Sequence, residues 1–186
     1  MVLKDRRTFI YRIDRNDTII QVNDQWLDFA RENDFDSGKL EAVVGSSLWD
    51  HIQDGGVRHL YRIIFERIRN GHPISGLPYR CDAPQCRRFM EMNLRETGEM
   101  AIEITSRIVR QEPREPVPLL SDFPDRSDDV MVISSYCKKV RIAESGWVEI
   151  EEAIMLTGVN ESWPLPGLSH SICDPCYAQW EARLDD

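Results

Sequence analysis

Residues 88–110 read RFMEMNLRETGEMAIEITSRIVR, and apolar and polar side chains alternate on both sides of Glu96-Thr97-Gly98-Glu99. An alternation with a period of two is typical of strands with one buried face, and a short polar segment between two such runs predicts an antiparallel hairpin. The expected apolar face consists of Met90, Met92, Leu94, Met100, Ile102, Ile104 and Ile108. The other face is mostly charged, so it tolerates water or a partner.

The residues before this hairpin contain segments that are expected to cover its apolar face. Residues 8–13 and 18–22 predict two short strands that are joined by a polar turn. Asn23 or Asp24 is then expected to cap a helix that ends near Asn33.

The clearest helix pattern follows a loop. Ser46 or Ser47 is expected to start a single helical turn, and Asp54 begins a long helix that stops at Asn70-Gly71. The apolar stripe of this helix contains Val57, Leu60, Tyr61, Ile64 and Ile68. Residues 74–82 then return as a strand, and the long helix is expected to lie across the sheet.

The order of these elements over residues 7–110 resembles that of a PAS domain. The resemblance rests on Asn23 after the second strand, the Val44-Gly45 turn, the helix over 54–70 and the closing hairpin over 88–110. It implies an α+β fold in which a five-stranded antiparallel sheet is covered by helices. It also implies signal sensing, frequent dimerisation, and in some members a small molecule between the helices and the sheet.

The sequence gives little support for the common cofactors of such a domain. An Asn-Cys-Arg-Phe type motif for flavin photochemistry is missing from the helical region. Haem needs an axial ligand, for which His51, His59 and His72 are the candidates. His59 falls on the polar side of the long helix and is expected to face water. Haem is therefore disfavoured, whereas another small ligand stays open.

Composition and charge limit the remaining possibilities. With 186 residues, 41% of them hydrophobic, the chain is long enough for one full core and an appendage. It has no apolar run of about 20 residues and no secretory signal, so no membrane contact and a cytoplasmic location are expected. Residues 111–186 contain 6 Lys+Arg against 15 Asp+Glu, whereas residues 1–110 contain 17 of each. This acidity argues against binding of nucleic acid.

Residues 111–129 are expected to form a linker between two units. Their prolines lack backbone donors and their aspartates favour solvent. We expect this segment to be extended and to contact the sensory domain through Leu119, Leu120 and Phe123.

The strongest chemical pattern lies in residues 130–186, which are expected to form a small Cys/His subdomain. Cys137 is followed 33 positions later by His170, and then by Cys173 and Cys176 in a Cys-x2-Cys pair. Thiolate and imidazole ligands suit tetrahedral zinc, and four protein ligands would close its coordination shell. The sequence therefore predicts a structural zinc ion at these four residues.

These residues also resemble a tail that follows PAS and receiver domains in bacterial signalling proteins. In that tail the first element is usually a second Cys-x2-Cys pair, and here Ser134 stands at its first position. Serine is a poor zinc ligand, so His170 would have to complete the shell. A packing of metal-free cysteines and a thiol-disulfide function of Cys173 and Cys176 remain as alternatives.

Cys81 and Cys86 form a second possible redox pair around Pro84. A reducing compartment disfavours a disulfide there, and two ordinary thiols are the simpler interpretation.

Signatures of catalysis are missing: the sequence has no phosphate-binding Gly-x4-Gly-Lys-Ser/Thr, no Gly-x-Ser-x-Gly and no His-Glu-x2-His. The leading hypothesis is thus a non-enzymatic sensory module that changes its association with a signalling protein such as a kinase or a response regulator. The alternative is a thiol-disulfide protein or redox sensor. A homodimer is also expected, because Phe89, Ala101 and Val109 make the outer face of the hairpin partly apolar.

Overall fold

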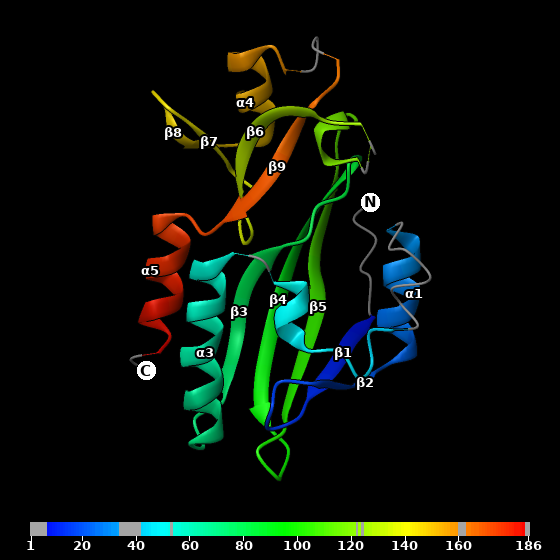
Figure 1. The fold of residues 1–186 in the computed structure, drawn as a ribbon, viewed down its shortest axis with the longest axis vertical. Coiled ribbons are helices and arrows are strands. Elements are labelled where there is room, and N and C mark those ends of the chain that lie inside the picture. The colour runs from blue at the N-terminus through cyan, green and yellow to red at the C-terminus, as the bar shows by residue number, and fades with distance from the viewer. Residues whose placement is uncertain are drawn as a thin grey trace.

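The computed structural model describes residues 7–33, 42–52, 54–121, 123, 125–159 and 163–184. Two β-sheets follow one another along the long axis of the molecule, and the five-stranded sheet is the N-terminal one (Figure 1). The predicted loop over residues 34–39 lies outside the described residues. Within the described ranges, every helix is too short or too polar to cross a bilayer.

The N-terminal sheet confirms the predicted fold class, a five-stranded antiparallel sheet combined with helices. Its strands lie in the order β2-β1-β5-β4-β3, and each neighbouring pair is antiparallel. The strands are β1 (Thr8–Ile13), β2 (Ile19–Val22), β3 (Ile74–Arg80), β4 (Cys86–Glu96) and β5 (Ile102–Pro113).

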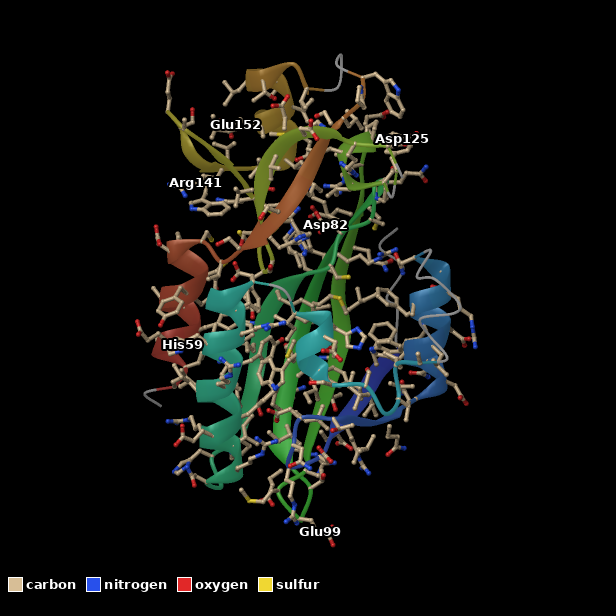
Figure 2. The ribbon with its side chains drawn as sticks, viewed as in Figure 1. His59, Asp82, Glu99, Asp125, Arg141 and Glu152 are labelled. Atoms are coloured by element: carbon tan, nitrogen blue, oxygen red, sulfur yellow. The ribbon has the colours of Figure 1, made fainter. Side chains whose placement is uncertain are left out.

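The central hairpin of β4 and β5 forms as its alternation predicts. Met90, Met92, Leu94, Ile102, Ile104 and Ile108 are all buried. Met100 differs from the prediction, since its side chain is 43% exposed. It has a positive φ of 67° in the turn next to Glu99, at the far end of the hairpin, so it does not continue the strand alternation (Figure 2).

The helices begin at the polar residues that the sequence indicated. Asn23 caps α1 (Asp24–Glu32), and its Oδ1 accepts from the Trp26 amide at 2.9 Å and from the Ile10 amide at 3.1 Å. One side chain therefore satisfies the helix end and attaches it to β1. Ser47 caps the 3₁₀ turn η1 (Leu48–His51), and Asp54 caps α3 (Gly55–Arg69).

The three helical elements cover one face of the sheet. The stripe of α3 is buried as predicted, including Leu60 and Ile64 at 1% exposure, against Leu94 and Ile104 of the hairpin. Near α1 a smaller cluster contains Phe9, Met90 and Ile108. The opposite face carries ion pairs, as expected for a charged surface, among them Arg107 with Glu91.

The C-terminal sheet has the order β8-β7-β6-β9, with β6 and β9 parallel. Its elements are β6 (Ser127–Ser134), β7 (Val140–Ile142), β8 (Gly146–Val148), α4 (Ile150–Thr157), β9 (Pro166–Ser171) and α5 (Asp174–Ala182). It has its own apolar cluster, which includes Ile133, Val140 and Ile150. This part of the chain is therefore more than an extended appendage.

The segment between the sheets is shorter than the predicted linker, because β5 runs to Pro113 and β6 begins at Ser127. Val117 and Leu119, which belongs to the 3₁₀ turn η2 (Pro118–Leu120), are buried in the C-terminal cluster. We expected Leu119 to contact the sensory domain. It packs in the second core instead, because the C-terminal sheet offers an apolar face of its own.

We predict that Ile64→Ala will lower the free energy of unfolding by about 2–5 kcal/mol, because it removes buried methyl groups and leaves a cavity between α3 and the sheet. His59→Ala on the same helix changes an exposed side chain and should alter the free energy of unfolding by less than about 0.5 kcal/mol. Urea unfolding of both variants tests this. Equal losses of stability would mean that α3 packs through its other face.

A second prediction concerns Glu103, a nearly buried carboxylate of the outer face that pairs with Arg12 and Arg95, each at 2.6 Å. Burial by itself would raise the pKa of Glu103, but the hydrogen bonds from Arg12 and Arg95 lower it below its usual value. A depressed folded-state pKa contributes stability above the unfolded pKa of about 4.3, and this contribution disappears as pH falls through the folded pKa.

Glu103→Gln should therefore cost about 1–3 kcal/mol at pH 7, through the loss of charged hydrogen bonds. The difference in the free energy of unfolding between this variant and the wild type should become smaller as pH falls from about 5 to about 3.5. Urea midpoints across this range measure it. A difference that stays constant with pH would show that the carboxylate charge contributes nothing.

Candidate metal centre

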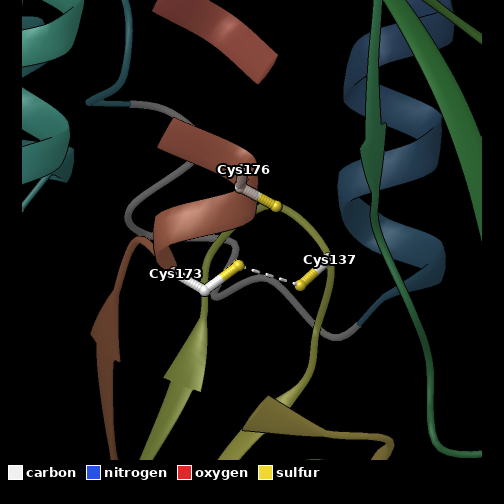
Figure 3. Close-up of side chains that lie close together, drawn as sticks. All are labelled: Cys137, Cys173 and Cys176. Atoms are coloured by element: carbon white, nitrogen blue, oxygen red, sulfur yellow. Dashed lines mark hydrogen bonds between the residues drawn. The ribbon is translucent and has the colours of Figure 1, made fainter. Parts of the chain in front are cut away.

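Three of the four predicted ligands lie together where the C-terminal sheet meets α5. Cys137 is in the turn after β6, Cys173 is the N-cap of α5, and Cys176 is in the first turn of that helix (Figure 3). The Sγ atoms of Cys137 and Cys173 are 3.6 Å apart, and all three sulfurs lie within 4.8 Å of one another.

Local backbone chemistry places these thiols. Lys138 has a positive φ of 60°, and its amide donates to the Ser134 carbonyl at 3.0 Å, which closes the turn behind Cys137. On the other side, Pro175 occupies the start of α5, a position where a missing amide donor costs nothing. The Cys-x2-Cys spacing therefore presents one thiol from the cap and one from the first helical turn.

The cluster favours ionisation of one of its thiols, that of Cys137. The hydrogen bond from Cys176 lowers the pKa of Cys137 to about 5, and the Ser134 hydroxyl and the Lys139 amide act in the same direction. The same contact raises the pKa of Cys176. Charge is thus concentrated on one sulfur, and it would spread over the cluster only if a cation replaced the thiol protons.

The geometry and the donor set fit a thiophilic metal ion. In a tetrahedral site with Zn–S bonds of about 2.3 Å, two sulfurs lie about 3.8 Å apart, close to the separation of Cys137 and Cys173. Ser134 is fully buried beside Cys137, and its Oγ accepts from the Cys137 amide at 3.4 Å. The site therefore offers three thiols and one neighbouring hydroxyl, and nothing in this set distinguishes zinc from other soft ions.

The fourth predicted ligand, His170, is not part of this group of sulfurs. It lies on β9, where its backbone is paired with Ile133 of β6, and its side chain is exposed on the wall of a cleft. Partial desolvation of the ring at the cleft wall lowers the pKa of His170, and the charge of Lys138 lowers it further against the opposing effect of Asp54. The structure thus brings together Cys137, Cys173 and Cys176 without the imidazole.

The other candidate residues lie elsewhere. All five cysteines are free thiols, and burial raises the pKa of Cys81, which makes it a weaker nucleophile. His51, His59 and His72 have exposed side chains, and the His51 ring is hydrogen-bonded to the Ser46 hydroxyl at 2.8 Å. The expectation that His59 faces water is therefore confirmed.

An ion-pair network that was not predicted from the sequence joins the two sheets. Asp82, whose side chain is fully buried, pairs with Arg80 and Arg114 at the junction of the sheets (Figure 2). Arg80 also contacts Glu149 at 2.8 Å, and Arg114 contacts Glu151. The acidity of residues 111–186 gave no indication that Glu149 and Glu151 contact these arginines. The arginines around the Cys81–Cys86 turn were the available signal for this network.

An aromatic contact connects the cysteine cluster with the N-terminal sheet. Trp180 of α5 is 1% exposed, and its ring lies 4.2 Å from that of Tyr136 and 5.9 Å from that of Tyr61 on α3. Cys173 and Cys176 belong to the same buried cluster as α3. The candidate metal centre is therefore part of the main core of the molecule.

No family model matches this chain, and no curated protein matches it. Two solved structures are similar to it at low identity. A domain of an HTR-like protein from Haloarcula marismortui shares 14% identity at a TM-score of 0.35, over 55% of this chain and 97% of that one. A sensory box sensor histidine kinase from Vibrio cholerae shares 12% identity at a TM-score of 0.38, over 56% of this chain and 82% of that one.

We predict that the protein purified without chelator contains about one equivalent of a thiophilic metal, and that Cys137→Ala removes it, because two thiols bind such an ion far more weakly than three. Cys86→Ala, a change to a cysteine outside the cluster, should leave the metal content unchanged. Elemental analysis of the three proteins measures this. Metal-free wild-type protein with fully reduced cysteines would remove the metal from the site.

Proposed function

We propose that this chain is a non-enzymatic sensory or regulatory module of bacterial signal transduction, a PAS-like domain with a zinc-stabilised C-terminal part. It acts by changing its association with a signalling protein such as a kinase or a response regulator. The resemblance of residues 7–110 to PAS domains supports this proposal, together with the five-stranded antiparallel sheet and its helical cover.

The observation that carries the proposal is the shared core of the sensory sheet and the cysteine cluster. Trp180 of α5 is buried and its ring packs on that of Tyr61 of α3, while Cys173 and Cys176 at the start of α5 belong to the cysteine cluster. A change at the sheet that moves α3 must therefore also move α5. Such a mechanical link is what a module needs if one end senses and the other end signals.

Zinc is the ion that we propose for Cys137, Cys173 and Cys176. When bound, it would supply folding free energy by joining the turn after β6 to the start of α5. The Ser134 hydroxyl beside Cys137 then acts as a hydrogen-bonding support for the thiolate. A role for the ion in structure agrees with the position of the cluster, where Cys173 is 2% and Cys176 9% exposed.

We also propose that the protein is a homodimer through the outer face of the N-terminal sheet. Val109 is 48% exposed there, and the Phe89 ring contacts the guanidinium groups of Arg110 and Arg80, at 3.8 Å and 5.5 Å from the ring centroid. A second copy could bury both side chains and satisfy the surrounding charges.

The mass of the protein in solution tests the proposed homodimer. Light scattering should give twice the chain mass of 21.7 kDa at micromolar concentration, and Val109→Glu should return it to the monomer by placing a charge in the interface. Val130→Glu, on the exposed surface of the C-terminal sheet, is the matched control. A monomer at all concentrations would contradict the dimer.

A redox sensor is the second candidate, and one observation favours it. The Cys137 thiolate lies 3.6 Å from Cys173, close enough for a disulfide after a small movement. Hydrogen peroxide could oxidise the two thiols to a disulfide while it is reduced to two molecules of water. Thiol titration after peroxide treatment separates the candidates, because a bound zinc ion should protect the three cysteines from oxidation.

A further inference from the structure

A cleft of about 980 Å³ lies between the two sheets, apart from the cysteine cluster. One wall is formed by the sensory sheet and α3, with Tyr61, Tyr79 and Met92. The other wall comes from the C-terminal sheet and includes Lys138 and His170. Ligand sites in proteins commonly have volumes of about 300–1,000 Å³, an apolar lining and a few polar groups that converge on the ligand.

Lys138 is a basic group of this cleft that has no carboxylate partner within the described residues, and the Cys137 sulfur before it attracts it less than Asp82 does. Its ammonium group donates to the Ser135 carbonyl at 2.9 Å, and it has no carboxylate within ion-pair distance among the residues that the structure describes. Asp82 is near enough to attract it, but Arg80 and Arg114 already pair with that carboxylate. A partly buried cation without a partner is costly, and an anion in the cleft would offset this cost.

The left-handed backbone conformation of Lys138 is enforced by the surrounding turn. Its φ of 60° is rare for a residue with a Cβ atom, and such conformations persist where the surrounding structure enforces them. The neighbouring turn residue Tyr136 also lines the cleft.

Two tyrosines and the N-cap residue of α3 also line the cleft. The buried Tyr136 hydroxyl lies beside that of Tyr61 but makes no hydrogen bond of good geometry within the described residues. Asp54, which also lines the cleft, is occupied as the cap of α3, where its Oδ1 accepts from the Val57 amide at 2.8 Å. The Asp54 carboxylate offsets the positive end of the α3 dipole, so the ammonium of Lys138 remains the positive charge of interest in this part of the cleft.

We propose that this cleft binds a small organic acid, with its carboxylate on Lys138 and its aromatic or branched aliphatic body against Tyr79, Met92 and Val57. The carboxylate completes the ion pair that Lys138 lacks. The apolar body of the acid packs against the aromatic ring of Tyr79 and the thioether of Met92, which line the same cleft. Binding stands independently of the proposed sensory function, whereas a role of the acid as the signal rests on that function.

Ligand-detected NMR titration of the metal-loaded protein tests this site with three probe acids, benzoate, phenylacetate and 4-methylpentanoate. At least one acid should bind in the millimolar range or better, and its uncharged amide should bind at least about tenfold more weakly, because the amide cannot form the ion pair. Lys138→Met should weaken binding of the acid at least about tenfold. Lys139→Met, a change of the neighbouring lysine that does not line the cleft, should leave binding unchanged.

A second variant distinguishes loss of the ligand site from an indirect effect on the nearby cysteine cluster. Ser169→Trp fills the cleft from an exposed position on β9 and should abolish binding while the metal content stays the same. The inference is overturned if no acid binds below about 10 mM, if acid and amide bind equally, or if Lys138→Met and Lys139→Met behave alike. Binding that leaves the solution mass unchanged would keep the site and remove its role in dimer-based signalling.

Discussion

The insertion of Trp180 between Tyr61 and Tyr136 is the contact on which the arrangement of the two sheets depends. A tryptophan buries about 150–250 Å², which is worth about 4–6 kcal/mol at 25 cal/mol per Å². Trp180 Nε1 has no hydrogen-bond partner among the described residues, which costs about 1–3 kcal/mol. The remaining gain is large enough to hold α5 against α3, and it places Cys173 and Cys176 in the main core.

The ion pairs around Asp82 fix the orientation that the aromatic contact leaves free. Apolar packing is tolerant of rotation, whereas the contacts of Arg80 with Glu149 and of Arg114 with Glu151 cross the junction and require one relative position of its two sides. The Arg80 amide also donates to the Tyr136 carbonyl at 2.6 Å, so backbone and side chain act on the same junction. Together these contacts shape the cleft that contains Lys138.

Local patterns predicted the parts of this structure that depend on neighbouring residues. Neighbouring residues determine the hairpin alternation, the helix caps Asn23 and Asp54, and the placement of the Cys173 and Cys176 thiols at the start of α5. The sequence therefore contains these features directly. The parallel pairing of β6 with β9 and the burial of Leu119 depend on distant partners, and no local signal specifies them. The position of His170 outside the sulfur cluster has the same origin, because the direction of β9 determines it.

The parallel pairing of β6 with β9 also sets the order in which the molecule can be completed during synthesis. Cys137 leaves the ribosome with β6, but the strand that pairs with β6 and the helix that carries Cys173 and Cys176 follow more than 30 residues later. The N-terminal sheet is contiguous in the earlier part of the chain and can fold first. In a nascent chain Cys137 therefore waits for its two partner thiols beside a finished N-terminal sheet, and assembly of the three-sulfur cluster becomes the closing event of its biogenesis.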